Sequence, residues 1–153
     1  MSADAHLSAE AYLAVAAITA GFGVSVLMFR IQRELTVVNE PDDPSLNWLP
    51  WADWLILGSI SLSLIGVILP LVIFKAPDQL KFSVAAASCA AGTVLLAAYP
   101  FAIIDHYRLI WGKRRWRKSM RNVIAEPGER VIVIAAVLIA AGAFIFTFRS
   151  LMS

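Results

Sequence analysis

Charge is scarce in this sequence. Charged residues make up 16% of the 153 positions, whereas hydrophobic residues make up 59%. Soluble domains carry about 25% charged and about 45–50% apolar residues, so this chain has too little polar surface to cover a core in water. The composition excludes an ordinary soluble domain and predicts a membrane protein.

Side chains that carry enzyme chemistry are also scarce. The chain has two histidines, His6 and His106, and one cysteine, Cys89, which cannot form an internal disulfide. The sequence has no recognisable cluster of metal ligands, glycine-rich phosphate loop or nucleophile–base pair. We therefore predict no catalytic residue, no cofactor and no metal, and hence no enzymatic activity. The alternative is an activity on lipid headgroups that uses Asp105 and His106, although neighbouring residues on a helix point about 100° apart.

Four long hydrophobic runs dominate what the chain does contain. About 20 apolar residues span a bilayer of about 30 Å as a helix, and none of these runs has the polar face that a soluble helix needs. The first basic residue, Arg30, follows the first run, whereas a cleaved signal peptide begins with a basic segment. The sequence therefore predicts an all-α membrane protein, with four transmembrane helices in an antiparallel bundle that forms one domain, 1–153. The predicted spans are 9–29, 54–74, 82–104 and 131–148.

Between their ends, the four runs contain no Asp, Glu, Lys, Arg or His. Ion-coupled transporters, proton relays and voltage sensors keep such residues inside the bilayer because their work requires charge there. All three classes are therefore disfavoured. Pro70 and Pro100 each remove a helical hydrogen bond near the end of a run. We expect bends near the membrane edges, rather than the broken mid-membrane helices that mark binding sites in transporters.

Basic residues lie mainly on one side of the predicted membrane. Loops 30–53 and 105–130 share one side and carry ten Lys and Arg, while the termini and the link 75–81 carry three. The positive-inside rule counts these residues near the span ends. We therefore predict a cell-membrane protein whose termini face outward and whose two longer loops are cytoplasmic. All five tryptophans fall at this cytoplasmic interface, where an apolar ring with a polar N–H is favoured: Trp48, Trp51, Trp54, Trp111 and Trp116.

The basic residues concentrate in the segment HYRLIWGKRRWRKSMR, residues 106–121. On a helix over 108–124, most basic residues fall opposite the apolar ones, which predicts an amphipathic interfacial helix between the third and fourth spans. Anionic headgroups would contribute about 1 kcal/mol per basic residue, and a protein partner is the alternative. Nucleic acid is disfavoured as a partner because the net charge is only +2. The residues predicted to contact lipid or a partner are Arg114, Arg115, Trp116, Arg117, Lys118 and Arg121.

The second run is preceded by the segment NWLPWADW, residues 47–54. Proline has no N–H, which costs nothing in the first turn of a helix, so we expect the second helix to begin near Asn47 with Pro50 early in it. Asp53 would then lie in the first turns, where the helix dipole favours a carboxylate. The alternative for Asp53 is a ligand or proton site.

Small residues recur at helical spacing in every run. They let helix backbones approach closely, and packing of this kind drives helix association in lipid. We predict helix–helix contacts at Ala17, Gly21, Ser25, Ser59, Ser63, Gly66, Ser88 and Gly92, and also at Ala136 and Ala140. The alternative is a narrow pore between subunits, bordered by the hydroxyls of Thr19, Ser25, Ser59, Ser63, Ser88 and Thr93.

Two classes of function remain. The first is a non-enzymatic accessory or scaffold component of a membrane complex, which packs against other membrane proteins or itself and contacts lipid or a partner through the basic cytoplasmic loop. The second is a homo-oligomeric channel or transporter for a small solute. We predict the first, because the spans lack the charges that ion-coupled transport requires. The two are distinguished by oligomeric state and by solute flux.

Overall fold

The computed structural model describes residues 3–38, 50–73, 78–106 and 127–153, and the regular elements in these ranges are all helical. The all-helical fold class is therefore confirmed. The elements are α1 (Ala3–Val38), α2 (Asp53–Ser61), the π-helix η2 (Leu62–Ile68), α3 (Leu69–Ile73), α4 (Gln79–His106) and α5 (Pro127–Met152).

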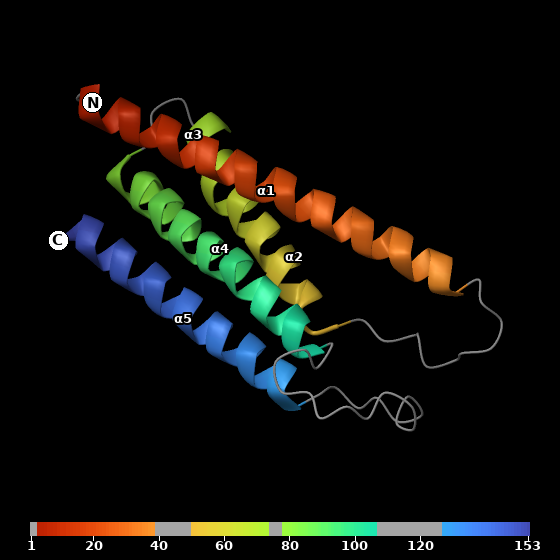
Figure 1. The fold of residues 1–153 in the computed structure, drawn as a ribbon. Coiled ribbons are helices and arrows are strands. Elements are labelled where there is room, and N and C mark those ends of the chain that lie inside the picture. The colour runs from red at the N-terminus through yellow and green to blue at the C-terminus, as the bar shows by residue number, and fades with distance from the viewer. Residues whose placement is uncertain (1–2, 39–49, 74–77, 107–126) are drawn as a thin grey trace.

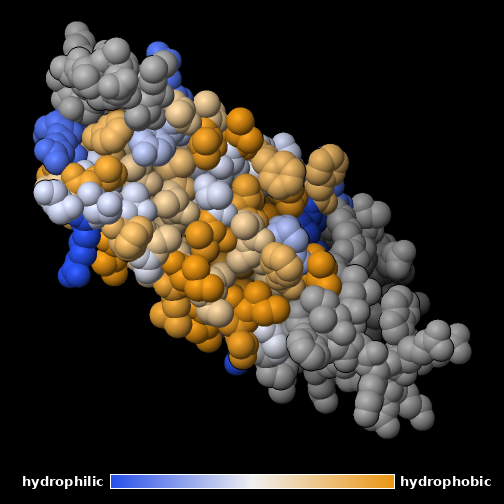
Figure 2. Space-filling model, turned by 60° about the vertical axis from the view of Figure 1, so that its left-hand side comes forward, coloured by the Kyte–Doolittle hydropathy of each residue, from blue (hydrophilic) through white to orange (hydrophobic). Residues whose placement is uncertain are grey.

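Four helical segments are long and apolar enough to cross a membrane, as the composition predicts. They are Ala9–Gln32, Asp53–Ile73, Gln79–Ile104 and Gly128–Met152. Large apolar side chains point away from the protein, among them Ile18 at 71% and Phe146 at 75% exposure. Hydrophobic side chains cover the middle of the face in Figure 2, and hydrophilic ones gather near its upper-left end. This surface suits hydrocarbon rather than water as its solvent.

α4 is the central helix of the fold. It packs against α1, against α5 and against every part of the second segment, by which we mean α2, η2 and α3 together. α5 packs mainly on α4. Figure 1 shows α1 and α5 on opposite sides of α4, with both chain ends toward the same end of the molecule. The protein is thus a three-helix unit of α1, the second segment and α4, with α5 added to the outer side of α4.

The core is built largely from alanine. One cluster of buried residues joins α2, α4 and α5, and a second joins α1, η2 and α4. The alanines at these contacts include Ala16, Ala85, Ala91, Ala136 and Ala140. Small side chains at the contacts let the backbones lie close together, which is how helices gain packing energy in lipid.

The second segment contains a π-helix that the sequence analysis does not predict. It covers Leu62–Ile68 and is followed directly by the short α3, which contains Pro70. A proline ring clashes with the carbonyl four residues earlier, here that of Gly66. Widening the helix before the proline moves that carbonyl, which gives a physical reason for the π turns at this place. Pro100, in contrast, lies inside α4, which continues to His106.

The start of α2 differs from the expectation. The helix begins at Asp53, and Pro50 precedes it in a turn instead of lying within its first helical turn. The N–H of Asp53 donates to the carbonyl of Pro50 at 3.1 Å, and that of Trp54 to Trp51 at 3.2 Å. These are bonds between residues three apart, so the chain enters α2 through a tight turn. The expected helix start near Asn47, with Pro50 in the first helical turn, is therefore wrong.

The start of α4 is held by two polar contacts. Asp78 caps the helix, because its Oδ1 accepts the backbone N–H of Lys81 at 2.9 Å. This hydrogen bond, helped by the nearby Lys81 ammonium group, lowers the pKa of the Asp78 carboxyl. In the first turn of α4, Nε2 of Gln79 donates to the carbonyl of Leu151 at 2.9 Å, which ties α4 to the last turn of α5.

Candidate functional site

Buried charges from three helices meet at the end of the molecule where α1 leaves its apolar stretch and α2 begins. Nε of Arg30 lies 3.5 Å from Oδ1 of Asp53, and the two side chains are 10% and 6% exposed. The sequence analysis assigns Asp53 to the first turn of α2, which is confirmed. It does not predict that this carboxylate is buried against Arg30 of α1.

Glu129 is the third buried charge, and the sequence analysis missed it. Its side chain is 0% exposed, although it lies in the first turn of α5. Its Oε1 accepts the backbone N–H of Ala52 at 2.9 Å. Ala52 directly precedes α2, so a carboxylate from α5 caps the start of α2, where free N–H groups and the helix dipole favour negative charge. The only sequence signal was a glutamate directly after Pro127 and Gly128, at the start of a predicted helix. The sequence does not show which other helix its carboxylate contacts.

Tyr99 of α4 adds a residue of the third membrane-capable segment to these charges. It is buried and lies close enough to Asp53 and Arg30 to interact with both electrostatically. We call these four residues, Arg30, Asp53, Tyr99 and Glu129, the charged cluster. Each of the four membrane-capable segments contributes one of them.

The energetics of the charged cluster favour a structural role. Removing two charges from water costs several kcal/mol per ion, and their attraction repays this only when the geometry is good. Once both are buried, losing one partner leaves the other uncompensated and costs about 3–5 kcal/mol. The pair of Arg30 and Asp53 therefore links α1 to α2, and losing either partner would be costly.

An arginine–tryptophan contact borders the charged cluster on its outer side. The guanidinium carbon of Arg130 lies 5.3 Å from the centroid of the Trp51 ring. Stacking of this kind contributes about 0.5–1 kcal/mol at exposed sites. Trp51 and Trp54 are both exposed at this end of the molecule, which suits the interface between hydrocarbon and water.

Five of the predicted small residues meet where the second segment packs on α4. Oγ of Ser59 donates to the carbonyl of Gly92 at 2.8 Å. A Cβ added at Gly66 would overlap the side chain of Ser88, and one at Gly92 would lie 3.8 Å from Oγ of Ser63. These residues form a close, hydrogen-bonded helix contact. Ala136 and Ala140 are likewise buried, against α4.

The predicted small residues of α1 lie elsewhere. Ala17, Gly21 and Ser25 are on the exposed face of the helix, and a Cβ added at Gly21 would meet nothing within 4 Å. The inward face carries a second set of small residues, of which Gly23 would place a Cβ 2.8 Å from Ile60. Both faces of α1 carry small residues, so spacing alone cannot tell which face packs. Within this chain the packing expected of the first three is not made.

Of the six hydroxyl groups that could border a pore, some are buried inside the protein and others are exposed. Thr19, Ser59, Ser63 and Ser88 are buried inside the protein. The exposed hydroxyls of Ser25 and Thr93 donate to carbonyls of their own helix, Gly21 and Cys89, each at 2.8 Å. A hydroxyl bonded four residues back along its helix tolerates a lipid-facing position. The six hydroxyls therefore share no surface.

The basic segment falls outside the described residues. This applies to Arg114, Arg115, Trp116, Arg117, Lys118 and Arg121, to the amphipathic helix over 108–124, and to Trp48 and Trp111. Contact of this segment with lipid or a partner stays a prediction. In the part of the chain that is described, no three His, Cys, Asp or Glu side chains lie close enough to hold a metal ion.

Comparisons with protein-family models, with curated proteins and with solved structures found no match for this chain. Its function is therefore inferred from its own residues.

Proposed function

We propose that this chain is a small multi-pass membrane protein that serves as a non-enzymatic accessory or scaffold component of a membrane complex. Its basic loop would contact anionic lipid headgroups or a protein partner on the cytoplasmic side. The observation that carries the proposal is the charged cluster, in which buried Arg30 and Asp53 from two spans pair with each other and buried Glu129 from a third caps the start of α2. Charges that pair between helices in this way support a role in holding the helices together.

The proposal includes an antiparallel order of the four spans, with both termini outside and the two longer loops in the cytoplasm. It is supported by the ten basic residues of those loops against three elsewhere. Cysteines at Ser153 and Ser119, in a Cys89→Ser background, test it in intact cells with a thiol reagent that does not cross membranes. We expect labelling at position 153 and protection at position 119. The opposite pattern would reverse the orientation.

The partner contact is tested by a photo-crosslinking amino acid at Trp116, in the native membrane. We expect a defined crosslink to another membrane protein, and its loss when Arg114 and Arg115 are both changed to Glu. The matched control is the same crosslinker at Phe146, which is 75% exposed on α5 and should react mainly with lipid. Equal crosslinking at both positions, or insensitivity to the charge reversal, would contradict the proposal.

Self-association is the second possibility, and one observation favours it. Ala17, Gly21 and Ser25 form an exposed stripe of small residues on α1, which suits close approach of another helix. A pore between copies has less support, because most of the hydroxyls proposed to line it are buried within one chain. Oligomeric state in mild detergent, followed by solute flux in liposomes, decides this. A stable ring with flux would favour the channel over the accessory role.

A further inference from the structure

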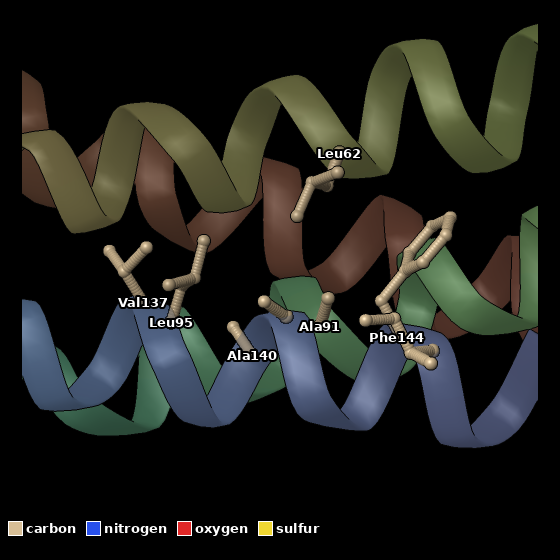
Figure 3. Close-up of a pocket in the computed structure, with 8 residues that line it drawn as sticks. Leu62, Ala91, Leu95, Val137, Ala140 and Phe144 are labelled. Carbon is tan, nitrogen blue, oxygen red and sulfur yellow. The ribbon is translucent and has the colours of Figure 1, made fainter.

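An apolar groove of about 330 Å³ opens on the side of the molecule, between the second segment and α5. Figure 3 shows side chains of α4 and α5 rising toward Leu62, which reaches down from η2. Its lining includes Leu62, Ala91, Val137, Ala141, Phe144 and Ile145.

The groove follows from the way α5 packs. α5 contacts α2 only slightly and rests mainly on α4, so a gap remains beside it. Ala91 and Ala141 have side chains too short to fill this gap, while Leu62 and Phe144 form its sides. Because α5 lies on the outside of the three-helix unit (Figure 1), the gap faces the surroundings of the protein.

A positive charge lies in line with the groove. Arg130 precedes Val137, Ala141 and Phe144 by seven, eleven and fourteen residues, which are close to whole numbers of turns. It therefore shares the groove face of α5 and lies about 10 Å from Val137 along the helix axis. Its guanidinium rests over Trp51, at the start of the second segment. The neighbouring Glu129 carboxylate is turned inward to Ala52.

We propose that this groove holds one acyl chain of an anionic phospholipid from the surrounding bilayer, with the lipid phosphate paired to Arg130 beside Trp51. A guanidinium donates to phosphate oxygens in a forked geometry that suits this pairing, and tryptophan is favoured at headgroup level. The proposal rests on the chain being a membrane protein. It does not depend on the accessory role, and either can fail without the other.

The size and lining of the groove favour an acyl chain over other occupants. A polar ligand would lose its hydrogen bonds to water against purely apolar walls, which costs about 2–7 kcal/mol per group. The lining residues extend over roughly 12 Å from Val137 to Ile145 along α5 and are all apolar, which suits a hydrocarbon chain. A single carbon chain is narrow enough to lie along it.

The test uses the full-length protein, stripped of lipid in mild detergent and analysed by native mass spectrometry. Phosphatidylglycerol and phosphatidylcholine with identical acyl chains are added separately. We expect one tightly bound phosphatidylglycerol per chain and weaker binding of phosphatidylcholine. Equal binding of both lipids would overturn the selection of an anionic headgroup, because phosphatidylcholine carries the same phosphate without a net negative charge. A dimer that binds no lipid would overturn the occupant, because a second copy would then cover the groove.

Two pairs of variants locate the site. Arg130→Gln should weaken phosphatidylglycerol binding by about tenfold or more, the loss of one charged hydrogen bond. Arg149→Gln, at the other end of α5, should leave binding unchanged. Ala141→Leu fills the groove and should abolish binding of both lipids, whereas Ala135→Leu makes the same change on an exposed position of α5 outside the groove.

Thermal unfolding checks that each variant is folded. If Ala141→Leu does not fold, Val137→Phe provides a second groove-filling variant at an exposed position. Undiminished phosphatidylglycerol binding by a folded groove-filling variant would overturn the proposal. So would an Arg130→Gln variant that binds like the wild type.

Discussion

Gly66 offers the sharpest test of how closely η2 packs on α4. An alanine there would place its Cβ 2.5 Å from Cβ of Ser88 and in overlap with the Ser88 hydroxyl. Carbon atoms make their best contacts at about 3.5–4.0 Å, so the two helices must separate by about 1 Å. Overpacking of this kind costs about 1–3 kcal/mol. The shift would also disturb the 2.8 Å hydrogen bond from Ser59 to Gly92, one turn along the same contact.

A matched substitution separates this steric cost from helix propensity. Alanine is favoured over glycine in a helix by about 1 kcal/mol, and this gain accompanies any such change. Gly21→Ala carries the gain alone, because a Cβ there meets nothing within 4 Å. We therefore expect Gly66→Ala to be less stable than Gly21→Ala by about 1–3 kcal/mol. The free energy of unfolding is measured in mixed detergent micelles with increasing dodecyl sulfate, by tryptophan fluorescence and far-ultraviolet circular dichroism.

The double variant completes the test. Ser88→Gly removes the two side-chain atoms that the new Cβ overlaps. Gly66→Ala combined with Ser88→Gly should therefore lose less stability than the sum of the losses in the two single variants. The coupling between contacting residues should lie at about 0.5–3 kcal/mol. Equal stability of Gly66→Ala and Gly21→Ala, or no coupling to Ser88→Gly, would refute the close contact.

Three further predictions use the same unfolding measurement. Arg30→Met should cost about 3–5 kcal/mol because it removes the positive charge beside the buried Asp53 carboxylate. Adding Asp53→Leu should recover most of that loss, and a double variant no better than the single one would contradict the ion pair. Ser59→Ala should cost about 0.6–1.7 kcal/mol, the range of hydrogen bonds between membrane helices, whereas Thr93→Val, whose bond lies within its own helix, should change little. The pKa of Asp78 is lowered, so the carboxylate contributes fully to the free energy of unfolding above the ordinary pKa of 3.8, and this contribution is lost as the pH falls through the lower folded pKa. Asp78→Asn should remove this part of the acid dependence of stability. An identical dependence of stability on acid pH in both proteins would show that the cap contributes nothing.

The four membrane-capable helices could be predicted because length and hydrophobicity are local properties. Any window of about 20 apolar residues must form a helix in a bilayer, since its backbone has no other hydrogen-bond partners. The close contact of Ser59, Gly66, Ser88 and Gly92 was also accessible, because small residues at helical spacing mark one face on each of two helices. The basic segment was accessible too, as a charge pattern, although its contacts stay a prediction.

The faces of α1 could not be assigned from spacing, because small residues recur on both of them. The packed face, which includes Gly23, was decided by the fit against Ile60. The π-helix depends on how the chain accommodates Pro70 between packed neighbours. Proline alone predicts a bend without saying whether the backbone kinks or widens.

The sequence by itself determined that the chain has four helices long and apolar enough to cross a membrane, because this depends only on the apolarity of consecutive residues. Only the tertiary structure decided which charges are buried together. Arg30, Asp53 and Glu129 each lie at the edge of a different apolar run, where the sequence alone predicts that a charged side chain contacts water. The packing of α1, α2 and α5 around their common end replaces that water with an ion pair and a carboxylate cap. The physical reason is that the burial of a side chain depends on residues of other helices packed around it, which the sequence of one helix does not specify.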